Sequence, residues 1–304
     1  MLLNNVASTP ELEISLEFFP AKTDAGAARL PAMARRLASC NPAFFSVTYG
    51  AGGTTQTGTL DTIRSIAGAT GWAGAAHLTA VAQSKATVDA VARDYLRAGV
   101  SRIVALRGDP QNGDAVYRPH PDGYANAAAL VAGLRRIHDF DISVAAYPEV
   151  HPDSRDVAAD LDNLRAKFDA GANRAITQFF FDADSYLRFR DAASAHGIWQ
   201  PILPGILPIR DLDQLRRFAA GCGATIPDAV VQRIEAAGTD RKERQRVGID
   251  LAAELCQRLV RHGVDGFHFY TLNQSDMVTA VCERLDLVRS GDRMVLAATG
   301  AAAR

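Results

Sequence analysis

One carboxyl group is a candidate for acid catalysis. Glu17 lies in the apolar segment Ile14-Ser15-Leu16-Glu17-Phe18-Phe19-Pro20. Flanking phenylalanines exclude water, which disfavours the charged form and predicts a raised pKa for this carboxyl. A carboxyl that keeps its proton near neutral pH can act as a general acid. The pattern is equally consistent with a strand glutamate held by a lysine or an arginine.

Other polar residues follow or end apolar segments. Asp109 comes after Leu106-Arg107-Gly108 and precedes Pro110, and an ordinary turn aspartate has the same surroundings. Each of four others is suited either to contact with a ligand or to a hydrogen bond inside the protein: Thr48, His77, Tyr147 and Gln178. They form a site only if the fold brings them together.

Four further candidates lie in two segments with helical periodicity. Asp160, Asn163 and Lys167 have the spacing i, i+3 and i+7, so they share one helix face, for which exposure to solvent is the simpler explanation. Phe218, within Leu215-Arg216-Arg217-Phe218-Ala219, is typical of a helix residue that faces the core. The position of each helix therefore decides whether these side chains do chemistry.

The elements that must position these residues are eight short apolar segments at intervals of roughly thirty residues. They are Ile14–Pro20, Phe44–Gly50, Gly74–Val81, Arg102–Gly108, Ile142–Pro148, Arg174–Asp182, Pro201–Ile209 and Gly266–Asn273. Segments with helical periodicity separate them, and several end in a glycine that suits a left-handed cap, as at Gly99, Gly171 and Gly263. This alternation predicts an α/β fold, a single (β/α)8 TIM barrel, whose loops after the strands converge on one pocket.

Length and composition favour one large domain. The chain has 304 residues, 48% of them hydrophobic, which predicts a single catalytic domain over residues 1–304 with flexible tails at 1–12 and 291–304. Two segments interrupt the alternation. Residues 110–123 form a candidate lid or binding loop, and residues 227–247 form an additional helical segment with a mixed charge run.

The charge balance and the cysteines exclude several classes of protein. A formal net charge of −1 gives no general attraction to nucleic acid or to an anionic membrane, so a small-molecule partner is expected. Residues 1–10 lack the features of a signal peptide and no apolar segment is long enough to span a membrane, which predicts a cytoplasmic protein. The four cysteines are widely separated and are expected to be reduced, and no metal site is assigned: Cys40, Cys222, Cys256 and Cys282.

The glycine-rich fingerprint of a Rossmann domain is absent from the sequence. The segments at residues 50–55 and 221–226 both fail at the last glycine of G-x-G-x-x-G. A Rossmann dehydrogenase is therefore disfavoured, and no Rossmann acidic residue is present to distinguish NADH from NADPH.

Eight sequence segments match segments of a known protein family and occur in the same order. They are Leu16–Pro20, Ser46–Gly50, His77–Thr79, Ala105–Asp109, Ala146–Pro152, Ala170–Asp182, Pro204–Pro208 and Phe267–Asn273. Together they resemble bacterial methylenetetrahydrofolate reductase from about Ile14 to Asp286. The resemblance implies a barrel that binds FAD and reduces 5,10-methylenetetrahydrofolate to 5-methyltetrahydrofolate, which feeds methionine synthesis. NADH or NADPH would supply the electrons.

The resemblance also implies roles for individual residues. The kinetics would be ping-pong, with nicotinamide and folate using the same flavin face in turn. Glu17 would be the general acid that opens the five-membered ring of the folate, and Asp109 would lie near the flavin and the pterin. Gln178 would contact either substrate, and Phe218 would stack on the nicotinamide cofactor or on the benzoate ring. The implied substrate-binding positions also include Thr48, Gln214 and Gln274.

A larger set of positions is implied for FAD. It comprises Thr48, His77, Arg107, Gly108, Asp109, Tyr124, Ala125, Tyr147, His151, Asp160, Asn163, Arg165 and Lys167. Within it, Arg165 and Lys167 are the cations suited to a diphosphate. The family resemblance further implies a homo-oligomer.

The sequence departs from the familiar bacterial members at three places. Residues 51–56 are uncharged where those members have a charged stretch, and Ala166 replaces a basic residue beside the flavin. Gln274 replaces an arginine that helps to hold the folate, so weaker binding of the acidic folate tail is expected. Two alternatives stay open, a flavin-free reductase with direct hydride transfer and a catalytically silent folate-binding homologue. Flavin content and turnover distinguish them.

Overall fold

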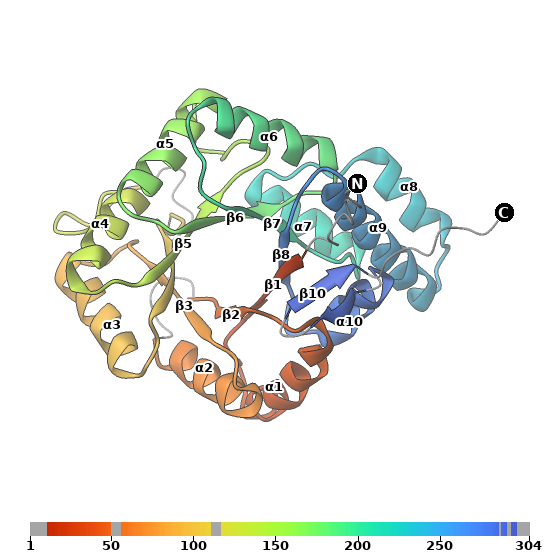
Figure 1. Ribbon diagram of the computed structural model, residues 1–304, viewed down its shortest axis with the longest axis horizontal. Helices are drawn as coiled ribbons and strands as arrows, with labels where there is room; N and C mark the ends of the chain where they lie inside the picture. Colours follow the sequence, from red (N-terminus) through yellow and green to blue (C-terminus); the bar gives the residue numbers. More distant parts are fainter. Residues whose placement is uncertain (1–10, 50–55, 111–116, 286, 291–292, 297–304) are drawn as a thin grey trace, which may run out of the picture.

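Eight parallel strands form a closed barrel in the computed structural model, which describes residues 11–49, 56–110, 117–285, 287–290 and 293–296 (Figure 1). Neighbouring strands pair in chain order, and a pairing of β1 with β2 closes the ring. The strands are β1 Glu11–Phe18, β2 Phe44–Val47, β3 Gly74–Thr79, β4 Arg102–Leu106, β5 Asp141–Ala146, β6 Arg174–Phe179, β7 Ile202–Ile206 and β8 Gly266–Tyr270. The predicted (β/α)8 barrel is confirmed.

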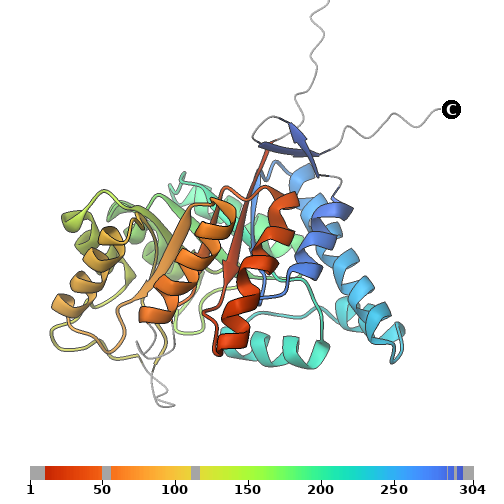
Figure 2. The same cartoon turned by 90° about the horizontal axis from the view of Figure 1, so that it is seen from below.

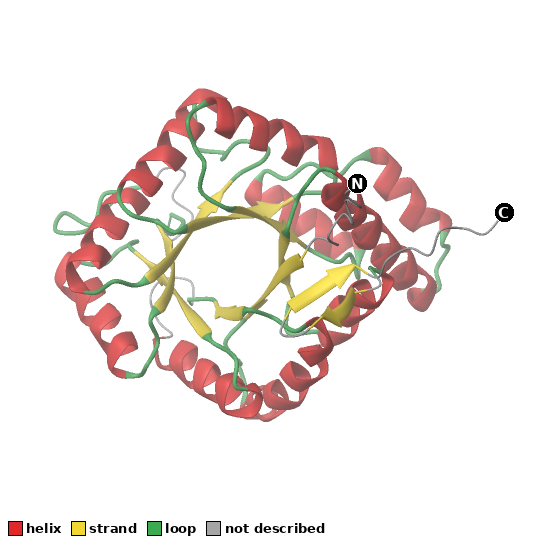
Figure 3. Ribbon diagram, in the orientation of Figure 1, coloured by secondary structure: helices red, strands yellow, loops and turns green. Residues whose placement is uncertain are grey.

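Helices surround the barrel as an outer ring (Figure 3). They are α1 Asp24–Arg36, α2 Gln56–Thr70, α3 Lys85–Arg97, α4 Ala127–Ile137, α5 Val157–Asp169, α6 Ala183–Ala195, α7 Leu212–Cys222, α8 Asp228–Ala236, α9 Arg241–Arg261 and α10 Ser275–Arg284. Side chains of Ser84, Asn126 and Asp156 accept hydrogen bonds from the first turns of α3, α4 and α5, which fixes where these helices begin. Gly99 and Gly171 adopt the expected left-handed conformation just after α3 and α5.

The core lies mainly between the barrel and the helices. Side chains alternate along each strand, so Leu16 and Phe18 of β1 belong to this outer core while Ser15 and Glu17 face the interior of the barrel. A smaller apolar cluster fills the barrel between the two ends, made of Phe44, Ala75, Val104, Ile176 and Leu203. The apolar interior closes the barrel below the carboxyl ends of the strands.

The chain differs from expectation near both ends. Residues 11 and 12, expected in a flexible tail, belong to β1 and pair with Val295 and Met294. Residues 293–296, also expected to be flexible, form β10, which pairs with β9 Leu287–Ser290. This antiparallel hairpin lies at the end of the barrel where β1 begins (Figure 2). The remaining residues of the two expected tails lie outside the described part of the chain.

No helix in the described ranges is long and apolar enough to cross a membrane. Residues 111–116, which are part of the expected lid, also lie outside the described part. So do residues 51–55, which make up most of the uncharged stretch that differs from the bacterial family members. The additional helical segment at 227–247 is present as α8 and the beginning of α9.

Candidate active site

A cavity of about 1330 Å³ opens at the carboxyl ends of the strands. Side chains from the barrel strands and the following loops line it, among them Glu17, His77, Asp109, Tyr147 and Gln178. Single-ligand pockets usually measure roughly 300–1,000 Å³. The cavity therefore has room for a dinucleotide and part of a second ligand.

Glu17 lies on the wall of the cavity between two imidazole rings. Its Oε2 atom is 3.4 Å from Nε2 of His77 and 3.6 Å from Nε2 of His268. Each ring has a serine partner, since Ser46 Oγ lies 3.2 Å from His77 Nε2 and Ser15 Oγ lies 2.8 Å from His268 Nδ1. His268 is fully buried, and its Nε2 has no hydrogen-bond partner among the described residues. The two rings therefore flank the carboxyl group at close range.

The expected raised pKa of Glu17 is wrong. Burial raises the pKa of this carboxyl, but the nearby rings of His268 and His77 lower it, and the net pKa lies below the ordinary value. The flanking phenylalanines do not cover the carboxyl, because Phe18 packs in the outer core and Phe19 is 39% exposed at the mouth. Burial lowers the pKa of His77 and the charge of Glu17 raises it, and the net pKa is lowered to about 4. This ring is therefore neutral at pH 7.

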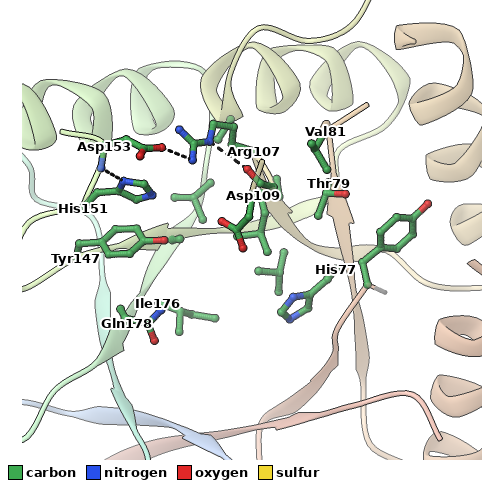
Figure 4. A pocket seen from close by; sticks show the side chains of 18 of the residues that line it. His77, Thr79, Val81, Arg107, Asp109, Tyr147, His151, Asp153, Ile176 and Gln178 are labelled. Atoms are coloured by element: carbon green, nitrogen blue, oxygen red, sulfur yellow. Dashed lines mark hydrogen bonds and ion pairs between the residues drawn. The ribbon is translucent and has the colours of Figure 1, made fainter. Parts of the chain in front are cut away.

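Four polar side chains from neighbouring strands and loops face the middle of the cavity (Figure 4). His77 comes from β3, Asp109 follows β4, Tyr147 follows β5 and Gln178 belongs to β6. Asp109 points between Tyr147 and His77 (Figure 4). Burial and the charge of Asp109 raise the pKa of Tyr147, so its hydroxyl keeps its proton. The predicted convergence of these residues is confirmed.

An irregular pairing of β6 with β7 positions Gln178. The register shifts between Ile176 and Phe179, and Thr177 Oγ1 accepts a hydrogen bond of 2.8 Å from the Gly205 amide. A Cβ atom at Gly205 would lie 2.2 Å from the Thr177 carbonyl oxygen, so only glycine permits this approach. Such bulges re-aim side chains, and both Ile176 and Gln178 line the cavity.

Positive charge gathers on one side of the cavity. Lys167 is buried and donates to the Ala145 carbonyl at 2.9 Å, and burial lowers its pKa to about 8. Arg107 is 2.7 Å from Asp153, and its guanidinium lies 4.5 Å from the centre of the Tyr117 ring. An anionic group could bind between these cations.

The β5–α5 loop brings His151 to the same side. Val150 has φ of +67°, a strained conformation for a β-branched residue. The His151 and Tyr147 rings pack edge to face with their centres 4.5 Å apart. The His151 amide donates a hydrogen bond to Asp160 at 3.1 Å. Burial and the charge of Arg107 lower the pKa of His151. The hydrogen bond to Asp160 helps to hold this strained turn, which places the His151 ring at the cavity.

Three cavity-lining hydroxyls support a polar ligand at this site. They are Tyr49 Oη, Thr79 Oγ1 and Tyr117 Oη, which are buried and have no hydrogen-bond partner among the described residues. Buried polar atoms normally have partners. The volume, these three hydroxyls and the cations Arg107 and Lys167 together suit an elongated ligand that carries phosphate groups.

The cavity contains most of the predicted site residues but not all. It is lined by Glu17, Thr48, His77, Arg107, Gly108, Asp109, Ala125, Tyr147, His151, Asn163, Lys167, Gln178 and Phe218. Five predicted residues are not in its lining: Tyr124, Asp160, Arg165, Gln214 and Gln274.

Tyr124, Asp160 and Arg165 contact other side chains. Tyr124 is buried and donates to Asp89 at 2.6 Å, while Asp160 accepts from His151 and Ser154 and so fixes the β5–α5 loop. Arg165 is half exposed and lies 3.8 Å from Asp162. Of the three predicted cations Arg107, Arg165 and Lys167, the cavity lining contains Arg107 and Lys167.

Sequence reasoning missed several residues of the site. His268 and Tyr270 alternate with outer-core residues on β8, a pattern that predicts inward-facing side chains. Thr79 stands two residues after His77 on the same strand and had the same signal. Ser15 stands two residues before Glu17 on β1 and had this signal as well. Asp153 carried no comparable signal, because it lies in a loop. In the described part of the chain, no three His, Cys, Asp or Glu side chains are grouped to hold a metal ion.

Comparisons with known proteins give a consistent result. The model of a family described as methylenetetrahydrofolate reductase matches residues 2–286. The chain is 45% identical to the 5,10-methylenetetrahydrofolate reductase of Pectobacterium carotovorum subsp. carotovorum, over 90% of each chain. It is 44% identical to the enzyme of that name from Escherichia coli (strain K12), over 92% of this chain and 93% of the relative.

A solved structure supports the fold. An uncharacterized protein from Clostridium thermocellum, described as binding two copies of 5-methyl-5,6,7,8-tetrahydrofolic acid, has a TM-score of 0.61 to this chain. The alignment covers 91% of this chain and 95% of the other. At 12% identity, the likeness shows the shared fold alone.

Proposed function

This chain belongs to the methylenetetrahydrofolate reductase family, and from that premise we propose that it reduces 5,10-methylenetetrahydrofolate to 5-methyltetrahydrofolate. NADH or NADPH is the electron donor and FAD the cofactor. The observation that carries the proposal is the placement of Glu17, Asp109 and Gln178 in the lining of one cavity that also contains the cations Arg107 and Lys167.

Glu17 is the proposed general acid. Its lowered pKa leaves the carboxyl ionised in the open cavity at neutral pH. When the pterin covers it and removes water, the charged form becomes less favourable and the carboxyl takes up a proton. That proton then goes to the folate nitrogen whose bond to the bridging carbon breaks, which opens the five-membered ring and leaves an iminium on the substrate.

Asp109 and Gln178 orient the folate. The carboxylate of Asp109 points into the cavity and can accept pterin N–H bonds. Gln178 offers its amide from β6, two strands along the barrel from β4, although its Oε1 already accepts from the Phe179 amide at 3.0 Å. Its amide nitrogen is the group left for a ligand. Phe218, 36% exposed on α7, offers an aromatic face at the mouth to the benzoate ring or to the nicotinamide cofactor.

The cationic side of the cavity is the proposed cofactor site. Lys167 and Arg107 would hold a diphosphate, and the lining hydroxyls of Thr79 and Tyr117 would donate to other polar groups. FAD, when bound, supplies the hydride acceptor and donor that couples oxidation of the nicotinamide to reduction of the folate in two successive half-reactions. The Tyr147 and His151 rings would exclude water from this side.

The direct test is product formation. Purified protein, NADH or NADPH and methylenetetrahydrofolate are mixed anaerobically, and 5-methyltetrahydrofolate is measured by mass spectrometry. The proposal predicts stoichiometric conversion with oxidation of the nicotinamide. Binding of the folate without conversion, in protein loaded with FAD, would contradict the reductase assignment and favour a folate-binding protein.

A further inference from the structure

An arginine outside the cavity lining is held at its rim by two loops. Arg210 lies in the β7–α7 loop, and its Nη1 donates to Oε1 of Gln274, the residue before α10. The same Nη1 is 3.5 Å from Asp276. Because both loops follow strands at their carboxyl ends, the contact lies on the face of the barrel where the cavity opens.

The loop that carries Gln274 has a fixed and strained conformation. Leu272 and Asn273 are consecutive non-glycine residues with positive φ, +49° and +54°. The Asn273 side chain accepts from the Phe19 amide at 2.8 Å and donates to the Phe19 carbonyl at 2.9 Å. The Gln274 amide donates to the Thr271 carbonyl at 2.8 Å. These bonds hold Gln274 toward Arg210.

The arginine is close to apolar residues of the cavity mouth. Leu207 precedes it by three residues and Leu272 precedes Gln274 by two, and both line the cavity. Phe218 of α7 also lines it, and Gln214 lies on the same face of α7 one turn earlier. A ligand that leaves the cavity between Phe218 and Leu272 would therefore pass next to Arg210.

The charge of Arg210 is only weakly neutralised. Asp276 is its one acidic neighbour within 4 Å in the described part of the chain, and the Asp276 side chain is 60% exposed. Such an exposed pair contributes little. The nearby Asp211 accepts from the Gln214 amide, and Asp213 is paired with Arg216. The Nε and Nη2 donors of Arg210 have no partner among the described residues, so a planar pair of donors remains for a carboxylate.

We propose that Arg210, oriented by Gln274, binds a carboxylate of the glutamyl tail of the folate substrate at the rim of the cavity. The inference rests on the proposed function. The pterin lies inward, near Glu17 and Asp109, and the benzoate ring reaches the mouth beside Phe218. A tail with two or more negative charges must then remain near water, and Arg210 is the cation that it meets there. A bidentate contact between the guanidinium and the carboxylate fixes the outer end of the substrate.

The test compares substrates with and without the tail. In the wild-type holoenzyme, KM for methylenetetrahydrofolate should be at least about tenfold lower than for methylenetetrahydropteroate, which lacks the glutamate. In Arg210→Gln, KM for the folate should rise by about tenfold or more with little change in kcat, while KM for the pteroate should stay the same. Arg216→Gln removes the same charge from α7 and is the control, with both KM values unchanged.

A relocation variant makes the test more specific. Because Arg210 and Gln274 are in contact, the double variant Arg210→Gln/Gln274→Arg places the cation on the facing loop and should recover most of the folate affinity.

Equal KM for folate and pteroate in the wild type, or an equal rise for both in Arg210→Gln, would overturn the inference and leave Arg210 as a structural contact. If Arg210→Gln does not fold, the wild-type preference for folate must still fall with added KCl, and a preference insensitive to salt overturns the inference. A wild-type enzyme that reduces neither substrate would instead contradict the proposed function.

Discussion

The carboxyl of Glu17 and its two imidazole neighbours are the chemical centre of the proposed reaction. Glu17→Gln keeps the shape of the side chain but cannot donate the proton that opens the folate ring. We expect folate reduction to fall by roughly 10²- to 10⁴-fold. Reduction of the flavin by NADH should be nearly unchanged, because that step needs no proton from Glu17. Stopped-flow absorbance of the two half-reactions measures both.

Glu13→Gln is the matched control for this experiment. Glu13 is exposed on the same strand, toward the end where β1 begins, so both half-reactions should keep their wild-type rates. An equal loss of both half-reactions in Glu17→Gln would mean that Glu17 binds or supports the site without acting as the acid.

His77 makes stability depend on pH. Its pKa is lowered to about 4, mainly by burial, against an ordinary 6.5, so the unfolded chain binds the proton more tightly. The folded state is then fully stable above pH 6.5 and loses stability as the pH falls from 6.5 toward 4. The loss attributable to this residue is on the order of 3 kcal/mol. We expect His77→Gln to remove most of this dependence in urea unfolding of the flavin-free protein.

The control for the pH experiment is His138→Gln, since His138 is exposed on the surface. Its profile of unfolding free energy should match that of the wild type between pH 4 and 7. A His77→Gln profile as steep as that of the wild type would contradict the assignment of this pH dependence to His77.

At the residue scale, sequence predicted the strand-borne part of the site better than the helix-borne part. His77 and Gln178 lie at strand ends, where alternation fixes which side faces inward. Arg165 and Lys167 are two residues apart on α5, and helical geometry sends them to different faces, so only Lys167 reaches the cavity. The lowered pKa of Glu17 could not be predicted, because it depends on His268, which is 251 positions away along the chain. The pairing of β1 with β8, in which His268 lies opposite Ser15, brings that ring close to Glu17.

At the scale of elements, the close packing of α9 against the β7–α7 loop fixes the rim of the cavity. A Cβ atom at Gly248 would lie 1.8 Å from the Ile209 carbonyl oxygen, next to Arg210. Gly248→Ala should therefore push the helix and the loop apart and lower the free energy of unfolding by about 1–3 kcal/mol. Urea unfolding followed by circular dichroism measures the change.

Gly221→Ala is the control, because a Cβ atom at this position on α7 meets nothing within 4 Å. Alanine favours the helix over glycine, so this variant should be as stable as the wild type or more stable by up to ~1 kcal/mol. If the two glycine variants had the same stability, the described contact of α9 with the loop would be wrong.

The elements themselves could be predicted where periodicity is strong. All eight barrel strands occur within about three residues of their expected beginnings, because each is a short apolar segment between helical segments. Helix α10 and the β9–β10 hairpin were not predicted. The hairpin pairs with only two residues of β1, Glu11 and Leu12, and such long-range pairing has no local signal in the sequence.

At the scale of the whole molecule, the barrel gathers one site from segments far apart in the chain. Glu17 from β1 and Tyr270 from β8 are direct neighbours in register, and both line the cavity with His77 and Gln178. The closed ring of strands fixes these positions, while the loops supply Asp109 and the cationic side. If the proposed function is correct, this one cavity must serve the nicotinamide and the folate in turn.

The most direct test of this claim is the visible spectrum of the purified protein, loaded with FAD and kept anaerobic, during successive additions. NADH alone should bleach the flavin absorbance near 450 nm. Methylenetetrahydrofolate added after removal of excess NADH should restore that absorbance and yield 5-methyltetrahydrofolate. Turnover of NADH and folate by protein without FAD would contradict the proposed role of the flavin. Bleaching by NADH with no recovery on addition of the folate would contradict the account of the site.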